Sequence, residues 1–583
     1  MNTMFGTIKK LPRLLQWDGR TRSSREDEPL FRVLTKKHIL MRLAVVWLTT
    51  FTVTALAIWW GQPLPYRQGE VYGYDLRARV EFTVINHVEL INQNRRADQK
   101  SIEEKANHSD RPVFERYPAG MLLVPRGEPI DKQFELLKEE HQAYLESQST
   151  KDHWNRGISL FLIFSLLTML DVMYVARFQA SLANSLPMIA GVCILVFGTI
   201  VLGTLLNAPP WNALLLPMTF TAMVLTLAYN PQFALMMSFS LELALTVVLG
   251  TSVDQLLIHM GGMATAILSL QHVRTRTQLV QIATGAGFAY FVTTIATGLL
   301  SEQTWSLTLI DAFRCLIWGS LAGFLLTGLL PIVERCFGII TEISLLELAD
   351  GSHPLMQELV RRAPGTYTHS MTVATLAEPA AEAIGANPLL TRVGSYFHDI
   401  GKMLKPQYFI ENQAGENRHD SLEPALSTLV IIGHVKDGVA LAQQYNLPKP
   451  IVDFIAQHHG TTLVEYFYRE AMRIQEANGE VSPDLEACFR YPGPKPQSRE
   501  HGILMLADAV ESTSRSLANP TPGSLGKLVH DLLMKRLLDG QFEESGLTLT
   551  ELHIIEESLC KSLIALFHAR IKYPEVEPEL KAA

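Results

Sequence analysis

The sequence predicts a mainly α-helical protein, in which a polytopic helical membrane bundle is joined to a small α+β external segment and to an all-α soluble domain. Three observations predict this class: a series of long apolar segments between residues 157 and 333, an apolar span at 41–60 behind basic residues, and a C-terminal part of mixed composition with helical periodicity. A helix that crosses a bilayer core needs roughly 20 mostly apolar residues, which these segments supply. The length of 583 residues allows several domains.

The first 60 residues predict a membrane anchor. Residues 1–40 contain nine Lys and Arg against four acidic residues, and Met41 to Trp60 then forms the first apolar span. The basic leader is too long for a cleaved signal peptide, and no cleavage site of small residues follows it. We therefore expect an uncleaved anchor whose N-terminus, residues 1–40, lies in the cytoplasm, because basic residues favour that side.

Residues 61–155 are expected to form an extracytoplasmic domain. The stretch VYGYDLRARVEFTVIN predicts strands, and DKQFELLKEEHQAYLES predicts an amphipathic helix. None of the five cysteines falls between residues 62 and 152, which excludes a disulfide framework there. The cysteines also lack the CxxC spacing of a thiolate zinc site.

Seven further apolar segments form the predicted membrane domain, residues 156–334. They lie at 157–176, 185–206, 211–229, 233–250, 253–270, 279–300 and 309–333. Together with the first span they predict eight crossings, which return the chain to the cytoplasm. Arg177, Arg274 and Arg276 fall in loops on the inner side, as expected. The segment at 253–270 is short and polar, and without it the C-terminal domain would lie outside.

Four ionisable residues lie within or at the ends of these spans: Asp171, Glu242, Asp254 and His259. Charged groups at membrane depth are costly and often functional, so a ligand or ion role is one interpretation. A position near the interface, where the side chain reaches water, is the other.

The last part of the chain, residues 335–583, predicts a cytosolic helical domain. ISLLELADGSHPLMQELVRRAP gives one amphipathic stretch, and PGTYTHSMTVATLAEPAAEAIGAN starts another behind a Pro-Gly turn. Thr548 and Glu551 stand at capping-box spacing at the start of a long final helix. The Pro-rich stretch VSPDLEACFRYPGPKPQSRE predicts a loop.

A set of polar residues in this domain predicts a metal site. An isolated His–Asp pair, such as His398–Asp399 in GSYFHDIGK, usually serves a turn. Here, however, five histidines and two aspartates lie in or at the ends of apolar helical stretches, where an unpaired imidazole or carboxylate is costly to bury. They are His369, His398, Asp399, His434, His458, His459 and Asp508.

The residue types favour two metal ions. Imidazoles and carboxylates without thiolates suit manganese, iron or another divalent first-row metal, and one carboxylate can bridge two ions. Neighbouring residues on a helix point about 100° apart, so His398 and Asp399 can both serve only if the metals lie between helices. Such a site predicts clamping of a phosphoryl group.

Several motifs carry a resemblance to a known family: PGTYTHS, LAEPAAEAIGANPLL, YFHDIGK, YFIENQ, HVKDGV, QHHGTTLVEYFY, RYPGPKP and ADAVES. Their order resembles the HD-domain phosphohydrolases and, more narrowly, the seven-transmembrane-receptor HD proteins, which are membrane-bound phosphodiesterases of cyclic di-AMP. With the membrane layout, the resemblance covers nearly the whole chain. It implies a centre loaded with iron or manganese that hydrolyses the cyclic dinucleotide to linear pApA.

The resemblance also implies roles for individual residues. His369, His398, Asp399 and Asp508 would hold one metal, and Asp399 would bridge to a second held by His434, His458 and His459. Lys402 would contact a phosphate, as its charge and flexible stem allow. Asp399 and Lys402 are thus the predicted catalytic residues. Further candidates for substrate contact are Lys405, Asn412, His419 and Arg515, although loop composition, or a surface ion pair of Arg515 with Glu511, would also explain them.

Two departures from the family pattern stand out. The external segment is much shorter than in many family members, which puts a shared extracellular ligand in doubt. Pro379 interrupts LAEPAAEAIG, where it would begin a new helix or form a kink.

Alternatives remain open at this stage. The cyclic di-GMP branch of the HD superfamily follows its HH pair with an acidic residue and a DGxGYP element, whereas this chain continues GTTLVEYF. A nucleotide phosphohydrolase and an inactive receptor that only binds a nucleotide are the other interpretations. A net charge of −8 does not favour a DNA or RNA polymer as partner. The expected partners are a cyclic dinucleotide and the lipid bilayer of the inner membrane; an extracytoplasmic ligand and a homodimer are left open.

Overall fold

The computed structural model describes residues 37–85, 114–208, 211–413, 415–478, 484–517 and 520–568. The predicted cytoplasmic N-terminus lies almost entirely outside these residues, as does the middle of the predicted external segment. The described residues form two compact units. One holds those within Met1–Thr221, Met236–Met260 and Val292–Phe313; the other holds those within Ala222–Leu235, Gly261–Phe291 and Arg314–Ala583.

One helix lies along each of the eight predicted apolar segments, and these eight helices differ in length. They are α2 Lys37–Trp60, α6 Thr150–Phe178, α8 Leu186–Leu206, α9 Leu215–Ala228, α10 Pro231–Leu249, α11 Val253–Ser269, α12 Arg276–Leu300 and α13 Trp305–Phe337. Six of them are long and apolar enough to cross a membrane, whereas α9 and α11 have only 14 and 17 residues. The predicted count of eight crossings is therefore not reached by length alone. A seventh helix that meets the same criteria is α18, Pro424–Gln444, in the C-terminal domain.

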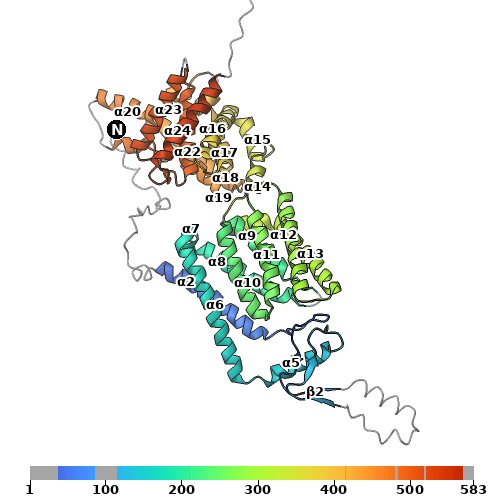
Figure 1. Cartoon of the computed structure of the whole chain (residues 1–583). Coiled ribbons are helices and arrows are strands. Elements are labelled where there is room, and N and C mark those ends of the chain that lie inside the picture. Colours follow the sequence, from blue (N-terminus) through green and yellow to red (C-terminus); the bar gives the residue numbers. More distant parts are fainter. Residues whose placement is uncertain are drawn as a thin grey trace, which may run out of the picture. The chain divides into compact units, whose positions relative to one another are not determined.

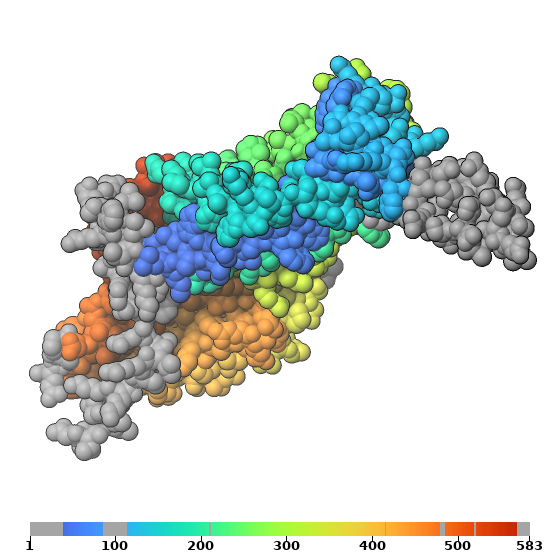
Figure 2. All heavy atoms as spheres, turned by 90° about the horizontal axis from the view of Figure 1, so that it is seen from below, coloured from blue at the N-terminus to red at the C-terminus, as the bar shows by residue number. Residues whose placement is uncertain are grey.

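The surface of α2 and α6 has the apolar character expected next to lipid. The two helices pack side by side, and Figure 2 shows them in blue and teal along one face. Large side chains such as Leu48, Phe51, Leu166 and Met173 are exposed on them. A contiguous apolar surface of this kind is stable in a bilayer but not in water. The chain is thus a multi-pass membrane protein.

The ionisable residues of the membrane helices have partners. Nδ1 of His259 on α11 lies 2.7 Å from Oε1 of Glu242 on α10, and both side chains are buried. The other two carboxylates accept hydrogen bonds from serine hydroxyls: Ser240 to Asp171 at 2.9 Å, and Ser301 to Asp254 at 2.5 Å. This pairing lowers the cost of placing charged groups there.

The segment between α2 and α6 is a small α+β unit, as predicted. β1 (Leu76–Arg77) pairs with β4 (Leu122–Val124), and β2 (Phe82–Ile85) pairs with β3 (Phe114–Tyr117), both antiparallel. Helix α5 (Phe134–Ser147) covers a core that includes Leu76, Phe82, Val124 and Leu137. Arg79 fixes the helix with a bidentate bond to the buried Glu140 carboxylate, at 3.1 and 2.8 Å.

The C-terminal domain is built from helices, and its described residues contain no strand. The α-helices are α14 Glu342–Leu348, α15 Pro354–Arg362, α16 Pro364–Ala383, α17 Pro388–Phe397, α18 Pro424–Gln444, α19 Lys449–Gln457, α20 Glu465–Asn478, α21 Leu485–Cys488, α22 Arg499–Ser514, α23 Pro522–Leu538 and α24 Leu549–His568. Short 3₁₀ turns η3 (Ile400–Leu404), η4 (Pro406–Tyr408), η5 (Ile410–Asn412) and η6 (Arg418–Ser421) join α17 to α18. Figure 1 shows these helices, from yellow to red, gathered into one bundle.

Two details differ from the helices that the sequence predicts. The stretch 343–364 is not one helix but two, because Asp350 and Gly351 lie in a turn between α14 and α15. Pro379 lies inside α16, which continues to Ala383, so it does not start a new helix. The predicted capping box does form, with Thr548 and Glu551 bonded reciprocally at the start of α24.

Two apolar cores hold the domain together around α16 and α17. One core joins α16 to α22, α23 and α24 and includes Leu376, Leu506 and Ile555. The other lies beneath α17 and η3 and includes Phe397 and Ile400. His398 directly follows Phe397, the last residue of α17, so the packing of Phe397 and Ile400 in this second core fixes the position of the His398–Asp399 pair.

The helix that begins the domain, α14, is tied to the loop between α11 and α12. Nε of Arg274 lies 3.1 Å from Glu342, and a terminal nitrogen of Arg276 lies 2.8 Å from Glu347. Single exposed ion pairs contribute little, about 0–1 kcal/mol each. Two on one short helix nevertheless fix its direction.

The end of α13 holds the same helix. The Glu334 carboxylate accepts a hydrogen bond from the backbone N–H of Thr341 at 2.8 Å and another from the Ser344 hydroxyl at 2.7 Å. Leu345 of α14 is buried in the core beneath α17. The chain therefore passes from α13 into the C-terminal domain through a short helix that contacts α13, the start of α12 and the core beneath α17.

Candidate metal centre

The His398–Asp399 pair lies at a break between two helices. α17 ends at Phe397, His398 is its C-cap, and Asp399 precedes η3 with φ −110° and ψ 14°. The chain changes direction at this point, so both side chains turn toward the same interior. Nε2 of His398 lies 3.2 Å from Oδ2 of Asp399, and both residues are fully buried.

One group of potential ligands gathers around Oδ2 of Asp399. It consists of His369 from α16, His398, Asp399 and Asp508 from α22, whose ligand atoms all lie within 4.8 Å of one another. Nε2 of His369 lies 3.1 Å from Oδ1 of Asp508 and 3.5 Å from Oδ2 of Asp399.

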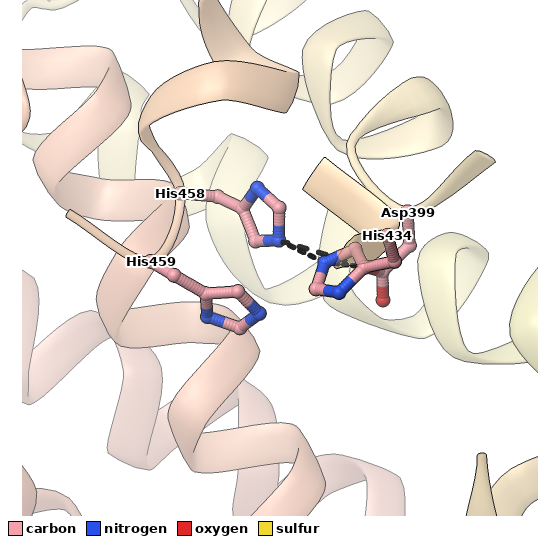
Figure 3. A group of neighbouring side chains, drawn as sticks. All are labelled: Asp399, His434, His458 and His459. Atoms are coloured by element: carbon pink, nitrogen blue, oxygen red, sulfur yellow. Dashed lines mark hydrogen bonds and ion pairs between the residues drawn. The ribbon is translucent and has the colours of Figure 1, made fainter. Parts of the chain in front are cut away.

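A second group gathers around the other oxygen of the same carboxylate. Figure 3 shows His434 of α18 and His458, at the end of α19, directed at Asp399, with His459 beside them. The Nε2 atoms of His434 and His458 lie 3.2 and 3.5 Å from Oδ1 of Asp399, and 3.3 Å from each other. The two oxygens of Asp399 thus face different groups, as a bridging carboxylate requires.

The tautomers of three histidines are set by the backbone. Nδ1 lies 2.7 Å from the Ser395 carbonyl in His398, 2.6 Å from the Ile431 carbonyl in His434, and 2.9 Å from the Ile455 carbonyl in His458. A carbonyl only accepts, so Nδ1 carries the proton and donates it. In the neutral imidazole Nε2 then keeps its lone pair and faces the centre, which is the form that binds metals.

The donor set fits a divalent cation. Nε2 of His369, Nε2 of His398 and Oδ1 of Asp399 are buried and have no hydrogen-bond partner. Buried polar atoms without a partner are rare and costly. Nitrogen and oxygen donors that converge in this way would be satisfied by a metal ion, and the absence of thiolates favours a first-row metal over a soft one.

The surroundings of the cluster favour the charged form of Asp399 and the neutral form of His459. Burial opposes ionisation of Asp399, but the ammonium of Lys402 and the imidazole of His398 hold its pKa well below the usual value. Burial and the neighbouring His458 lower the pKa of His459 in turn. An anionic carboxylate beside neutral imidazoles is the protonation state in which these groups coordinate a cation.

His369 and His398 differ from these histidines because carboxylates surround them. Burial disfavours their charged forms, but the neighbouring carboxylates of Asp399, Asp508 and Glu511 raise the pKa of His369 well above its ordinary value. The charge of Asp399 likewise raises the pKa of His398 to about 9. A metal ion at this group would therefore displace protons, and its affinity would rise with pH.

Two carboxylates of the centre were not predicted from the sequence. Glu511 of α22 is buried, and its Oε2 lies 2.5 Å from Nδ1 of His369, where it orients the ring. Its place three residues after Asp508 on one helix face was the available signal. Glu411 of η5 lies 3.1 Å from the ammonium of Lys402, which also lies 2.7 Å from Asp399.

The predicted substrate residues lie in different settings. Asn412 accepts hydrogen bonds from the backbone N–H groups of Gly365 and Thr366 and thereby fixes the start of α16. The other three also have partners, which are the Tyr408 carbonyl for His419, Asp437 for Lys405 and Glu511 for Arg515. These contacts describe side chains that hold loops and helices, and substrate contact by them stays a prediction.

The glycine of HDIGK permits the close packing of the centre. A Cβ atom on Gly401 would lie 1.9 Å from the carbonyl oxygen of His434 and 2.5 Å from the backbone nitrogen of Gly438. Both atoms belong to α18 and cannot move aside. Only glycine lets η3 approach α18 closely enough to bring Asp399 to His434.

The fold and site together define a multi-pass helical membrane protein with an all-α domain that carries a His/Asp cluster able to hold metal ions. Comparison with known families agrees. Residues 154–341 match the family described as "7TM receptor with intracellular HD hydrolase", and residues 366–513 match the HD domain. These two matches confirm the resemblance to 7TM receptors with an HD hydrolase domain that its motifs show.

Two curated relatives carry the same name. "Cyclic-di-AMP phosphodiesterase PgpH" of Bacillus subtilis (strain 168) is 39% identical over 378 residues, which are 63% of this chain and 52% of that protein. The protein of the same name from Listeria monocytogenes is 34% identical over 471 residues, 78% of this chain and 64% of that one. The chain thus spans between half and two thirds of their length. The crystal structure of the L. monocytogenes PgpH HD domain is 45% identical, covers 37% of this chain and all of that one, and has a TM-score of 0.35.

Proposed function

We propose that this protein is a metal-dependent phosphodiesterase that hydrolyses cyclic di-AMP to linear pApA. The observation that carries the proposal is the pair of four-residue ligand groups that share Asp399. The name of the two PgpH relatives supports the choice of substrate. A phosphodiester bond is hydrolysed readily where two cations and a carboxylate bridge are held close together.

In this proposal each group holds one manganese or iron ion. His369, His398, Asp399 and Asp508 form the first site, and Asp399 forms the second with His434, His458 and His459. When bound, two such ions supply Lewis-acid stabilisation of the charge that develops on the phosphoryl group. The chain orients the ligands through backbone carbonyls at three histidines and through Glu511 at His369.

Lys402 would act on this centre through charge. Its ammonium contacts Asp399 and Glu411 and holds both as carboxylates, because their charges lower the cost of its own burial. With this arrangement Asp399 stays anionic over the physiological pH range. The predicted contact of Lys402 with a substrate phosphate would require it to leave one of these partners.

The location of the parts follows the sequence-based prediction. We propose residues 1–40 as a cytoplasmic N-terminus, 61–155 as an extracytoplasmic domain, 41–60 and 156–334 as membrane spans of the inner membrane, and 335–583 as a cytosolic HD domain. The external and membrane parts would regulate hydrolysis, with an extracytoplasmic ligand or a homodimer as candidate inputs. Maleimide labelling of the exposed Cys488 in intact and in permeabilised cells tests the orientation: labelling in intact cells would contradict it.

The activity is tested with the full chain in lipid nanodiscs, loaded with Mn²⁺ or Fe²⁺ and supplied with cyclic di-AMP or, separately, cyclic di-GMP. We expect cleavage of cyclic di-AMP to pApA, loss of more than about a thousandfold in Asp399→Ala, and normal rates in Asp531→Ala, an exposed carboxylate on α23. Cleavage of cyclic di-GMP alone would assign another cyclic dinucleotide. No cleavage with both metals bound would favour a receptor that only binds nucleotide.

A further inference from the structure

The cationic residues near the centre differ in whether a carboxylate already neutralises them. Lys402 contacts both Asp399 at 2.7 Å and Glu411 at 3.1 Å. Arg515, another predicted substrate residue, pairs with the buried Glu511. A phosphate that bound to either cation would have to compete with carboxylates already in place. A cyclic dinucleotide nevertheless carries two negative phosphodiesters, and the metal pair accounts for one of them.

Arg536 on α23 is a cation of a different kind. Its Nε atom is buried without a hydrogen-bond partner, and within the described part of the chain no acceptor is recorded for its guanidinium. The nearby Asp539 is engaged elsewhere, since both of its oxygens contact Arg490, at 2.9 and 3.2 Å. A guanidinium nitrogen that is buried without a partner is costly, and this cost falls when a ligand supplies an anion.

The contacts of α23 place Arg536 beside the metal centre. This helix packs against α22, which carries Asp508, and Asp539, three residues after Arg536, accepts a hydrogen bond from Arg490, the neighbour of Tyr491. The carboxylates of Asp508, Asp539 and Glu465 and the phenol of Tyr491 act on the charge of the guanidinium. Tyr491 is itself part of the site wall, because its ring centroid lies 4.3 Å from that of His459 and 6.3 Å from that of His434. The guanidinium therefore lies within the field of the first ligand group.

We propose that Arg536 binds the phosphodiester of the cyclic dinucleotide that is not attacked. The planar fork of a guanidinium matches two phosphate oxygens, and this geometry makes arginine better suited than lysine to fix the position of a phosphate. With one phosphodiester at the metal ligands and the other at Arg536, the ring of the substrate is held at two points. The residue thus selects ligands with two phosphates. The inference rests on the proposed hydrolysis of a cyclic dinucleotide.

The test compares steady-state kinetics of the full chain in nanodiscs for the wild type, Arg536→Ala, Arg536→Lys and Lys535→Ala, all with Mn²⁺. Lys535 is the matched control, since it is half exposed and pairs with Glu465. We expect Arg536→Ala to raise KM for cyclic di-AMP about ten- to hundredfold, the range for a lost hydrogen bond to a charged group, with kcat within about threefold. Arg536→Lys restores part of the loss, and Lys535→Ala changes neither constant.

A second substrate separates binding from structure. Bis(p-nitrophenyl) phosphate has one phosphodiester, so its hydrolysis at the metal centre is unchanged in Arg536→Ala if the residue binds the second phosphate. An equal loss on both substrates, or a loss of bound Mn²⁺, would show a structural role and overturn the inference. So would an unchanged KM for cyclic di-AMP in Arg536→Ala. A wild type that does not cleave cyclic di-AMP would instead refute the proposed function, and the inference with it.

Discussion

Removal of the Glu511 carboxylate should weaken metal binding at the His369 group. Glu511 and His369 are both almost fully buried, and Oε2 of Glu511 lies 2.5 Å from Nδ1 of His369. The carboxylate fixes the ring and raises the basicity of Nε2, which faces Asp399 and Asp508. Glu511→Gln keeps an acceptor but loses the charge, whereas Glu511→Ala loses both.

The size of the effect follows from the strength of this contact. A buried hydrogen bond to a charged group contributes about 1.5–3 kcal/mol, which corresponds to about a ten- to hundredfold change in an equilibrium constant. Outer partners of metal-bound histidines show the same range in metal affinity. We therefore expect Glu511→Ala to raise the Kd for Mn²⁺ about ten- to hundredfold, and Glu511→Gln to raise it less.

The measurement is a titration of the metal-free full chain with Mn²⁺, followed by the signal of free Mn²⁺ in electron paramagnetic resonance. The matched control is Glu556→Ala on α24, which removes a similar carboxylate from His530 at 2.9 Å outside the cluster. A Kd within twofold of the wild type in Glu511→Ala, in protein that melts normally, would refute the orienting role. Weaker binding of equal size in the control would show a general effect on the fold.

Three further predictions follow from other parts of the HD domain. Burial lowers the pKa of His501 to about 4, so between pH 6.5 and 4 the unfolded state binds a proton and the folded state does not. The contribution of the neutral His501 to the free energy of unfolding is therefore complete above the unfolded pKa of 6.5 and is lost as the pH falls below it. The difference in the free energy of unfolding between pH 7.5 and 5, measured by denaturant titration, should therefore shrink by about 2 kcal/mol in His501→Gln. It should stay the same in His553→Gln, the exposed control, and equal changes in both variants would contradict the assignment. Gly401→Ala should abolish Mn²⁺ binding, because its Cβ would meet the His434 carbonyl. Gly433→Ala has open space around the new Cβ and should bind Mn²⁺ normally. Normal binding by both variants in the same titration would contradict the packing argument. Addition of EDTA to Mn²⁺-loaded protein should lower the melting temperature in scanning fluorimetry, because an ion at a hundred times its Kd stabilises the fold by about 2.7 kcal/mol, and an unchanged transition would show that the metal does not join the helices.

The sequence predicts which seven residues gather at the centre, because each lies in an apolar helical stretch where an isolated polar group is improbable. The structure brings all seven together, from His369 on α16 to Asp508 on α22. Glu511 and Arg536 escape prediction because charged residues at helical spacing are usually exposed, and only the packing shows that Glu511 is buried and that Nε of Arg536 is enclosed. Their roles depend on partners far away in the chain, which a local pattern does not contain.

The fold shows the same division. Apolar length predicts where the membrane helices lie, but it does not fix their ends, and α9 and α11 are shorter than the segments that contain them. Helical periodicity predicts α16 and α24 well. The same periodicity predicts α14 and α15 as one helix, because the apolar pattern continues across the turn at Asp350 that the structure shows.

The attachment of α14 has a mechanical consequence. Arg274 and Arg276 hold this helix at the start of α12, and Glu334 holds it at the end of α13. Its Leu345 shares one core with Phe397, the last helical residue before His398 and Asp399. The start of α12, the end of α13, α14 and the core beneath the His398–Asp399 pair are thus joined by a continuous series of contacts.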